Sequence, residues 1–121
     1  MFSLFKESFK ENIIREEFEP ILTKLIELLY KSSNNAQAEW VEKIKFSLLS
    51  NDLDAFKKKL ISVDMWGGSG AVWEVGGFVT DLDDREFMLE LIKLLDLIKK
   101  CGIKNKGAQS RMRILKKETR I

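Results

Sequence analysis

One segment in the middle of the chain, residues 65–78 (MWGGSGAVWEVGGF), interrupts a sequence that otherwise has the character of helices. This segment, the Gly/Trp loop, holds five of the seven glycines and two of the three tryptophans. Glycine loses much conformational entropy on folding, so a glycine cluster indicates a backbone that needs positive φ or a close approach to another group. Tryptophans beside such a turn would anchor it in the core. We therefore predict a loop pinned by Trp66 and Trp73, in which Ser69 caps a short turn over residues 70–75.

On both sides of the Gly/Trp loop, apolar residues recur with the spacing of amphipathic helices. Four helices are expected before the loop and a fifth after it. The apolar residues that mark them are, in chain order, Phe5, Phe9 and Ile13; Ile21, Leu25 and Leu29; Trp40, Ile44 and Leu48; Leu53, Phe56 and Leu60; and Phe87, Leu91, Leu94 and Ile98. The only proline, Pro20, fits best in the first turn of the second helix, where no N–H donor is needed.

Polar residues next to these segments suit the ends of helices. Asn34 and Gln37 form a variant of the capping box before the third helix. Asp83 or Asp84 is suited to cap the fifth helix. Gly102 is a suitable left-handed stop for the same helix. The sequence thus predicts where the third helix begins and where the fifth helix begins and ends.

The composition favours a single helical domain. The chain has 121 residues, of which 45% are apolar, enough to bury a core without disulfides or metals. Charged residues make up 33% of the chain and proline occurs once, which favours helices over a β-sandwich or barrel. We expect a single-domain all-α bundle of about five to six helices, with the helical domain over residues 1–103 and the Gly/Trp loop between the fourth and fifth helices. Residues 104–121 form a basic C-terminal tail with enough apolar residues for a short docked helix.

The net charge of +2 hides a segregation of charge along the chain. The tail has seven Lys or Arg residues against Glu118, a net charge of +6, whereas residues 1–103 have 14 basic and 18 acidic residues, a net charge of −4. Cys101 is the only cysteine, so no disulfide can form within the chain and a reducing compartment fits best. The sequence shows neither a signal peptide nor the roughly 18 consecutive apolar residues of a membrane span. We expect a cytoplasmic protein without membrane contact.

No catalytic or ligand-binding pattern accompanies the Gly/Trp loop. The chain has no histidine, which excludes Ser–His and Cys–His nucleophilic catalysis. Gly68 and Gly70 match the start of a dinucleotide fingerprint, but Trp73 stands where its third glycine would be. The acidic run from Asp81 to Glu86 lacks the glycine and the glutamate of a calcium loop. We expect no enzyme activity, no cofactor, no metal site and no small-molecule substrate.

The residues from Trp66 to Glu74 read W-G-G-S-G-A-V-W-E. Together with their neighbours in residues 60–75 they resemble a family of small bacterial helical proteins with the signature W-G-G-x-G-[SA]-V-W-[DE]. Trp40 and the sequence N-D-L-D-A-F at residues 51–56 are similar to the same family, so the resemblance covers about residues 35–80. The resemblance implies a small, helical, non-catalytic domain of the kind found at bacterial toxin–immunity loci. The Ser/Ala position of the signature is Ala71 here.

The resemblance and the acidic character of residues 1–103 lead us to expect a cytosolic immunity protein that binds and neutralises a cognate protein toxin domain, such as a nuclease. The expected partner-binding residues lie in and beside the Gly/Trp loop: Asp64, Trp66, Ser69, Glu74, Asp81, Asp83 and Asp84. The alternative is a nucleic-acid-binding regulator that uses the basic tail. The tail has no aromatic residue on which bases could stack, so nucleic acid is the less suitable partner.

Overall fold

A computed structural model of the chain describes residues 2–103 and 105–119, with side chains from residue 14 onward. In chain order its elements are α1 (Phe2–Lys31), α2 (Asn35–Leu49), α3 (Leu53–Leu60), α4 (Val63–Trp66), the 3-10 helix η1 (Val72–Glu74), α5 (Asp81–Lys100) and α6 (Lys106–Thr119). The predicted all-α fold is confirmed, and no strand occurs among the described residues. Within this part of the chain, none of the helices combines the length and the apolar character needed to cross a membrane.

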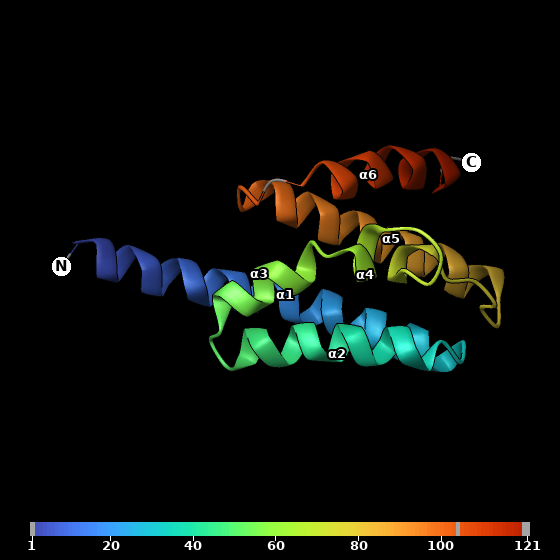
Figure 1. Cartoon of the computed structure of the whole chain (residues 1–121), viewed down its shortest axis with the longest axis horizontal. Coiled ribbons are helices and arrows are strands. Elements are labelled where there is room, and N and C mark those ends of the chain that lie inside the picture. Colours follow the sequence, from blue (N-terminus) through green and yellow to red (C-terminus); the bar gives the residue numbers. More distant parts are fainter. Residues whose placement is uncertain (1, 104, 120–121) are drawn as a thin grey trace.

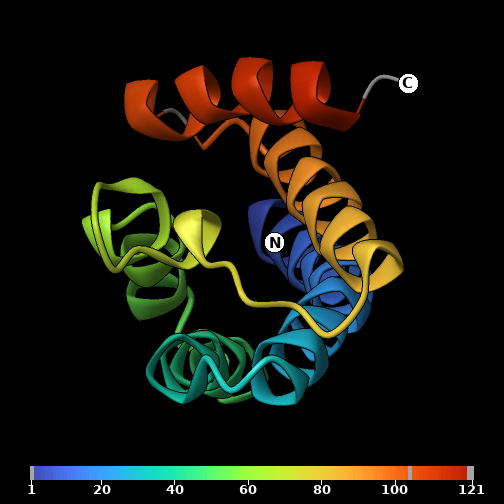
Figure 2. The same cartoon turned by 90° about the vertical axis from the view of Figure 1, so that its right-hand side faces the viewer.

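The helices form two antiparallel hairpins with a short middle section between them. α1 and α2 lie side by side and run in opposite directions, as do α5 and α6 (Figure 1). α1 also packs against α5 and so joins the two hairpins, whereas α3 packs on α2. Viewed along the bundle, α3 and α4 lie on one side, and the chain from η1 to α5 crosses in front of the other helices (Figure 2). The Gly/Trp loop therefore lies between the two hairpins.

α1 is one continuous helix, so the prediction of two helices that separate before Pro20 is wrong. Proline removes the backbone hydrogen bond to the carbonyl of Glu16, but both residues are exposed and water can replace the donor. Phe18 and Leu22 are fully buried and keep the same helical face on either side of the proline. Packing of this face outweighs the local cost of about 3 kcal/mol. The predicted apolar stripe of Phe5, Phe9 and Ile13 lies outside the described side chains.

The core is built from one apolar face of each long helix, with buried phenylalanines at the contacts between elements. Phe18 of α1 and Phe56 of α3 pack edge to face, with 5.1 Å between their ring centroids. Phe87 of α5 is buried and packs on Phe78 of the Gly/Trp loop, with 4.9 Å between the centroids. Aromatic pairs of this kind stabilise a core beyond the area that they bury. They tie α3 to α1 and the loop to α5.

Asn34 stands at the predicted N-terminal position of α2 but makes no side-chain capping bond, and the predicted cap of α5 is wrong because another side chain caps that helix. Thr80, rather than Asp83 or Asp84, caps α5, and its Oγ1 accepts a hydrogen bond from the Asp83 N–H at 3.0 Å. The two aspartates instead lie in the first turn, where carboxylates suit the helix dipole. Asn34 precedes α2 without making a capping bond. Its side chain and that of Gln37 bind the Gly/Trp loop, as described below.

The long helices end at residues in the left-handed conformation. Gly102 follows α5 with a φ of 74°, which confirms the predicted stop, and its N–H donates to the Lys99 carbonyl at 3.0 Å. Ser33 and Asn51 occupy the same position after α1 and α2, with φ values of 62° and 60°. The turn at Ser33 reverses the chain within a few residues and sets the antiparallel course of α1 and α2.

α6 is held against the rest of the fold by buried apolar residues and by the side-chain amide of Asn105, which both accepts and donates a hydrogen bond. Ala108 and Leu115 are buried where α6 packs on α5. The side chain of Asn105 accepts from the Ala108 N–H at 2.9 Å through Oδ1 and donates to the Ile61 carbonyl at 3.2 Å through Nδ2. Because the same side chain begins α6 and binds the end of α3, the described part of the basic tail is a docked helix.

Candidate protein-binding face

The two tryptophans of the Gly/Trp loop donate hydrogen bonds to nearby backbone. The Trp66 side chain is buried, with 2% of its surface exposed, and its Nε1 donates to the Leu60 carbonyl at 2.7 Å. Trp73 is half-buried, and its Nε1 donates to the Gly67 carbonyl at 2.6 Å. The prediction that tryptophans anchor the loop is confirmed, with Trp66 inside the core and Trp73 at its edge.

Gly67 is required by a close approach of the backbone. A Cβ atom at this position would lie 2.6 Å from the Val63 carbonyl oxygen, which is closer than non-bonded atoms approach. Gly70 has a φ of 87°, a conformation that residues with side chains rarely adopt. The same left-handed residue separates Ser69 from η1, which follows Ala71 and has no side-chain cap. The predicted Ser69 cap over residues 70–75 is therefore wrong.

Amide side chains of the first hairpin hold the Gly/Trp loop. Gln37 of α2 donates through Nε2 to the Gly70 carbonyl at 3.1 Å. Asn34, at the corner between α1 and α2, donates through Nδ2 to the Gly76 carbonyl at 2.9 Å. Backbone carbonyls in a non-helical loop need such partners when the loop packs on other elements. The residues expected to cap α2 thus position the loop.

The second hairpin holds the same loop through Arg111 of α6. Its guanidinium carbon lies 4.4 Å from the centroid of the Trp73 ring, a cation–π contact. Its Nε donates to the Trp66 carbonyl at 3.0 Å. Arg111, a cation of the basic tail, therefore makes contacts within the fold and binds the loop at both Trp66 and Trp73.

The structure does not bring the predicted partner-binding residues into one site. Trp66 is buried, and Asp83 is 9% exposed and pairs with Lys31 Nζ at 2.9 Å. That ion pair joins the start of α5 to the end of α1, so both residues serve the fold. The other five are exposed in two places: Asp64, Ser69 and Glu74 in or beside the Gly/Trp loop, and Asp81 and Asp84 in the first turn of α5.

A highly exposed aromatic side chain lies elsewhere, on a surface shared by α1 and α2. Phe46 of α2 has 72% of its surface exposed, and its neighbour Leu49 has 45% exposed. Phe46 lines two shallow hollows, and Thr23 and Ile26 of α1 line one of them. We define the Phe46 face by the residues that share this surface: Thr23, Ile26, Tyr30, Glu42, Lys45, Phe46 and Leu49.

Tyr30 and Glu42 link the two helices at the edge of the Phe46 face. The Tyr30 hydroxyl donates a hydrogen bond to the Glu42 carboxylate. This bond, together with partial desolvation and the charge of Glu42, raises the pKa of Tyr30 to about 12. The Tyr30 side chain remains 42% exposed. The polar contact therefore orients an aromatic ring that is still available to a partner.

Charges of both signs surround Phe46. Glu39 and Glu42 are followed along α2 by Lys43 and Lys45, and Lys59 of α3 lines the second hollow. The Lys59 ammonium is held in place by the Ser47 hydroxyl at 2.8 Å. The Phe46 face is therefore distinguished by its exposed aromatic side chain and the hollows beside it, and not by charge of a single sign.

The apolar spacing of the third predicted helix does not point to Phe46. The stripe of Trp40, Ile44 and Leu48 marks the side that packs inward, and Phe46 lies two residues from Ile44, on the opposite side of the helix. The sequence does show that Phe46, between Lys45 and Ser47, stands outside the apolar stripe of this helix.

Comparisons with known proteins find no matching family model, curated protein or solved structure. The resemblance of residues 60–75 to the small bacterial family therefore remains a prediction. Among the described side chains, no three His, Cys, Asp or Glu residues gather as metal ligands do.

Proposed function

We propose that this protein works by binding another protein, and that it is an immunity protein which neutralises a cognate toxin domain. The observation that supports a binding role is the Phe46 face. An aromatic ring with 72% of its surface in water gains free energy when a partner's pocket covers it. Exposed Leu49 and Tyr30 extend the same surface, and aromatic residues are frequent hot spots of protein interfaces.

The Phe46 face lies on regular helices whose positions are fixed by contacts within the fold. α2 packs on α1 and α3, and the Tyr30–Glu42 and Lys59–Ser47 hydrogen bonds cross between these helices. A surface that is ordered before binding loses little conformational entropy when a partner docks. The face is therefore suited to tight, non-catalytic association.

The choice of a toxin as partner is supported by the sequence. Residues 60–75 resemble proteins of toxin–immunity loci, and residues 1–103 carry a net charge of −4. An acidic surface steers a basic partner such as a nuclease domain and increases the rate of association. Asp64, Glu74, Asp81 and Asp84 are exposed and supply part of this charge.

Co-expression with the toxin encoded by the neighbouring gene tests the proposal. The wild-type protein should protect cells and bind the purified toxin domain. Phe46→Ala should weaken that binding by about 30-fold or more, as truncation of a hot-spot residue does, and should leave the helical circular dichroism unchanged. Leu82→Ala is the matched control, because Leu82 is 77% exposed but lies on α5.

Two results would change the assignment. Failure of the wild-type protein to protect against any toxin encoded beside it would contradict the immunity function. Protection that survives Phe46→Ala but is lost on charge reversal at Asp64 and Glu74 would move the interface from the Phe46 face to the Gly/Trp loop.

A nucleic-acid-binding regulator is the second candidate, and the exposed cations of α6 favour it. Lys106, Arg113, Lys116 and Lys117 are all exposed on this helix. Binding of this kind releases counterions, so affinity for a DNA duplex would fall steeply between about 50 mM and 200 mM salt. Tight, salt-sensitive binding that is lost when the exposed Lys106, Arg113, Lys116 and Lys117 are replaced by glutamine, without toxin protection, would favour the regulator over the immunity protein.

A further inference from the structure

A groove lies between α5 and α6, in the hairpin that does not carry the Phe46 face. Its volume is about 240 Å³. Its apolar wall is formed by Leu95 and Ile98 of α5, Ile103 of the connection, and Ala108 and Met112 of α6. Ligand pockets for drug-sized molecules measure about 300–1,000 Å³, so this groove suits a smaller molecule.

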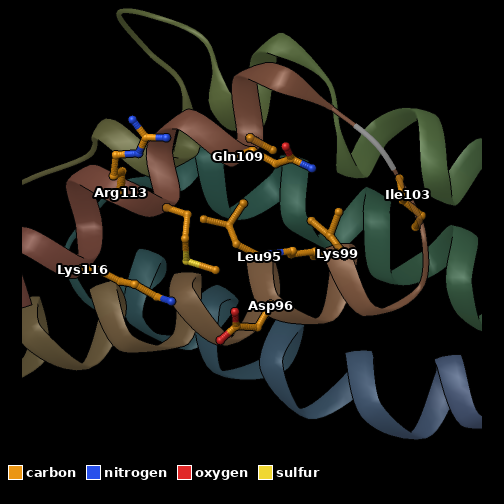
Figure 3. A pocket seen from close by; sticks show the side chains of 10 residues that line it. Leu95, Asp96, Lys99, Ile103, Gln109, Arg113 and Lys116 are labelled. Carbon is orange, nitrogen blue, oxygen red and sulfur yellow. The ribbon is translucent and has the colours of Figure 1, made fainter.

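Cations dominate the polar part of the same groove. Lys99 comes from α5, and Arg113 and Lys116 come from α6, whereas Asp96 is the one carboxylate in the lining. Figure 3 shows Lys116 reaching from α6 toward α5 on the side of Asp96, whereas the guanidinium of Arg113 points away from α5. The lining therefore combines an apolar wall with a net positive charge of two.

We propose that the groove between α5 and α6 binds a linear aliphatic carboxylate, with its chain along the apolar wall and its carboxylate near Lys99 and Lys116. An apolar wall stabilises the methylene groups of such a ligand, which inorganic phosphate cannot use. A nucleotide would require more volume and a surface for its base, and the lining contains no aromatic residue. The site is independent of the Phe46 face and of the proposed immunity function.

Occupancy of the groove should also tighten the Gly/Trp loop. The ligand would contact α5 and α6 together and so stabilise the docking of α6. α6 carries Arg111, which holds Trp73 and the Trp66 carbonyl from the side of the loop. Amide hydrogen exchange in residues 66–75 is therefore expected to slow when the ligand binds.

Titration of the purified full-length chain with hexanoate, octanoate and decanoate, followed by NMR, tests the site. For octanoate we expect a Kd on the order of 1 mM, as for a ligand of about ten heavy atoms. Each added methylene that the groove covers should tighten binding about fourfold, until the groove is full. Shifts should concentrate on α5, α6 and Ile103. Equal affinity for acetate and octanoate, or shifts spread over every surface lysine, would overturn the proposal.

Charge variants separate the groove from general attraction to a basic tail. Lys99→Gln and Lys116→Gln should each weaken octanoate binding about two- to fivefold. Asp96→Asn removes the opposing carboxylate and should strengthen binding about twofold. Lys100→Gln and Lys117→Gln are matched controls, since each adjoins a groove lysine in sequence but lies outside the lining. Equal losses of octanoate affinity in the control and groove variants would overturn the proposal. Displacement of bound decanoate by inorganic phosphate as effectively as by octanoate would also overturn it.

Discussion

The Gly/Trp loop and the Phe46 face use aromatic residues in opposite ways. At the start of the loop, Trp66 is the last residue of α4, has 2% of its surface exposed and donates to the Leu60 carbonyl, and the irregular backbone follows it. On the Phe46 face, a regular helix presents Phe46 with 72% of its surface exposed. The segment with the most unusual composition therefore serves the fold, whereas an ordinary helical residue forms the exposed apolar surface.

The two regions differ because a helix and an irregular loop differ in how many of their own backbone hydrogen bonds they satisfy. A helix satisfies its own backbone hydrogen bonds, so its outward side chains are free for contact with a partner. The loop depends on Gln37, Asn34 and Arg111 to bind its carbonyls and its tryptophan ring. Unusual composition thus marks the place where the backbone is hardest to build.

Truncation of Trp66 and of Phe46 should produce the largest difference in the free energy of unfolding between the two regions. Trp66→Ala should lower the free energy of unfolding by about 3–5 kcal/mol, because it leaves a cavity and removes the donor to the Leu60 carbonyl. Phe46→Ala should change it by less than about 0.5 kcal/mol, since the ring is mostly in water. Urea denaturation followed by circular dichroism measures both. Similar losses in the two variants would remove the contrast between the loop and the face.

Alanine substitution of Gly67 and of its neighbour Gly68 tests whether the close backbone contact at Gly67 limits the stability of the loop. Gly67→Ala should destabilise the fold by about 1–3 kcal/mol, because its Cβ would lie 2.6 Å from the Val63 carbonyl oxygen. Gly68→Ala is the control, since a Cβ at Gly68 meets no atom within 4 Å, and a change of less than about 0.5 kcal/mol is expected. Thermal unfolding of both variants distinguishes them. A Gly67→Ala protein as stable as the parent would show that the close contact relaxes at no cost.

Removal of Arg111 tests whether the tail fastens the loop. Arg111→Ala should cost about 1–2 kcal/mol of stability through loss of the contact with the Trp73 ring and of the hydrogen bond to the Trp66 carbonyl. Arg111→Lys should lie between the alanine variant and the parent, because it keeps the charge and loses the Nε donor. Arg113→Ala, at an exposed position of the same helix, should be close to neutral. Equal effects at both arginines would indicate a general effect of charge.

The smallest effect concerns the pKa of Tyr30, the only tyrosine of the chain. Its pKa is raised to about 12, mainly by the hydrogen bond to Glu42, so the phenol should ionise at a higher pH than its ordinary value of 10.0. The stabilisation linked to this shift is fully present below pH 10 and is lost as the pH rises toward 12. Glu42→Gln should lower the pKa more than Glu39→Gln, because the charge of Glu39 is the weakest cause. Tyrosinate absorbance during a pH titration measures this, and identical curves would contradict the Tyr30–Glu42 bond.

The helical class and most helix positions follow from the amino-acid sequence alone. Apolar residues at helical spacing lie on the buried faces, as Ile44 and Leu48 of α2 and Leu91 and Leu94 of α5 show. Gly102 ends α5 as its conformational freedom predicts. These features depend on residues a few positions apart, and the hydrophobic effect acts on them in any tertiary arrangement that buries one side of a helix.

Other features depend on contacts between residues that are distant in sequence, and these became visible in the folded protein. Packing of α1 against α2 and α5 carries the helix through Pro20, which local preference alone would place at a helix start. Asn34 and Gln37 bind loop carbonyls that are 42 and 33 residues away in sequence, instead of capping α2. Phe46 is exposed because the elements that pack on α2 cover its other side. Side-chain partners and exposure are set by which surfaces meet in space, and local propensity carries no information about that meeting.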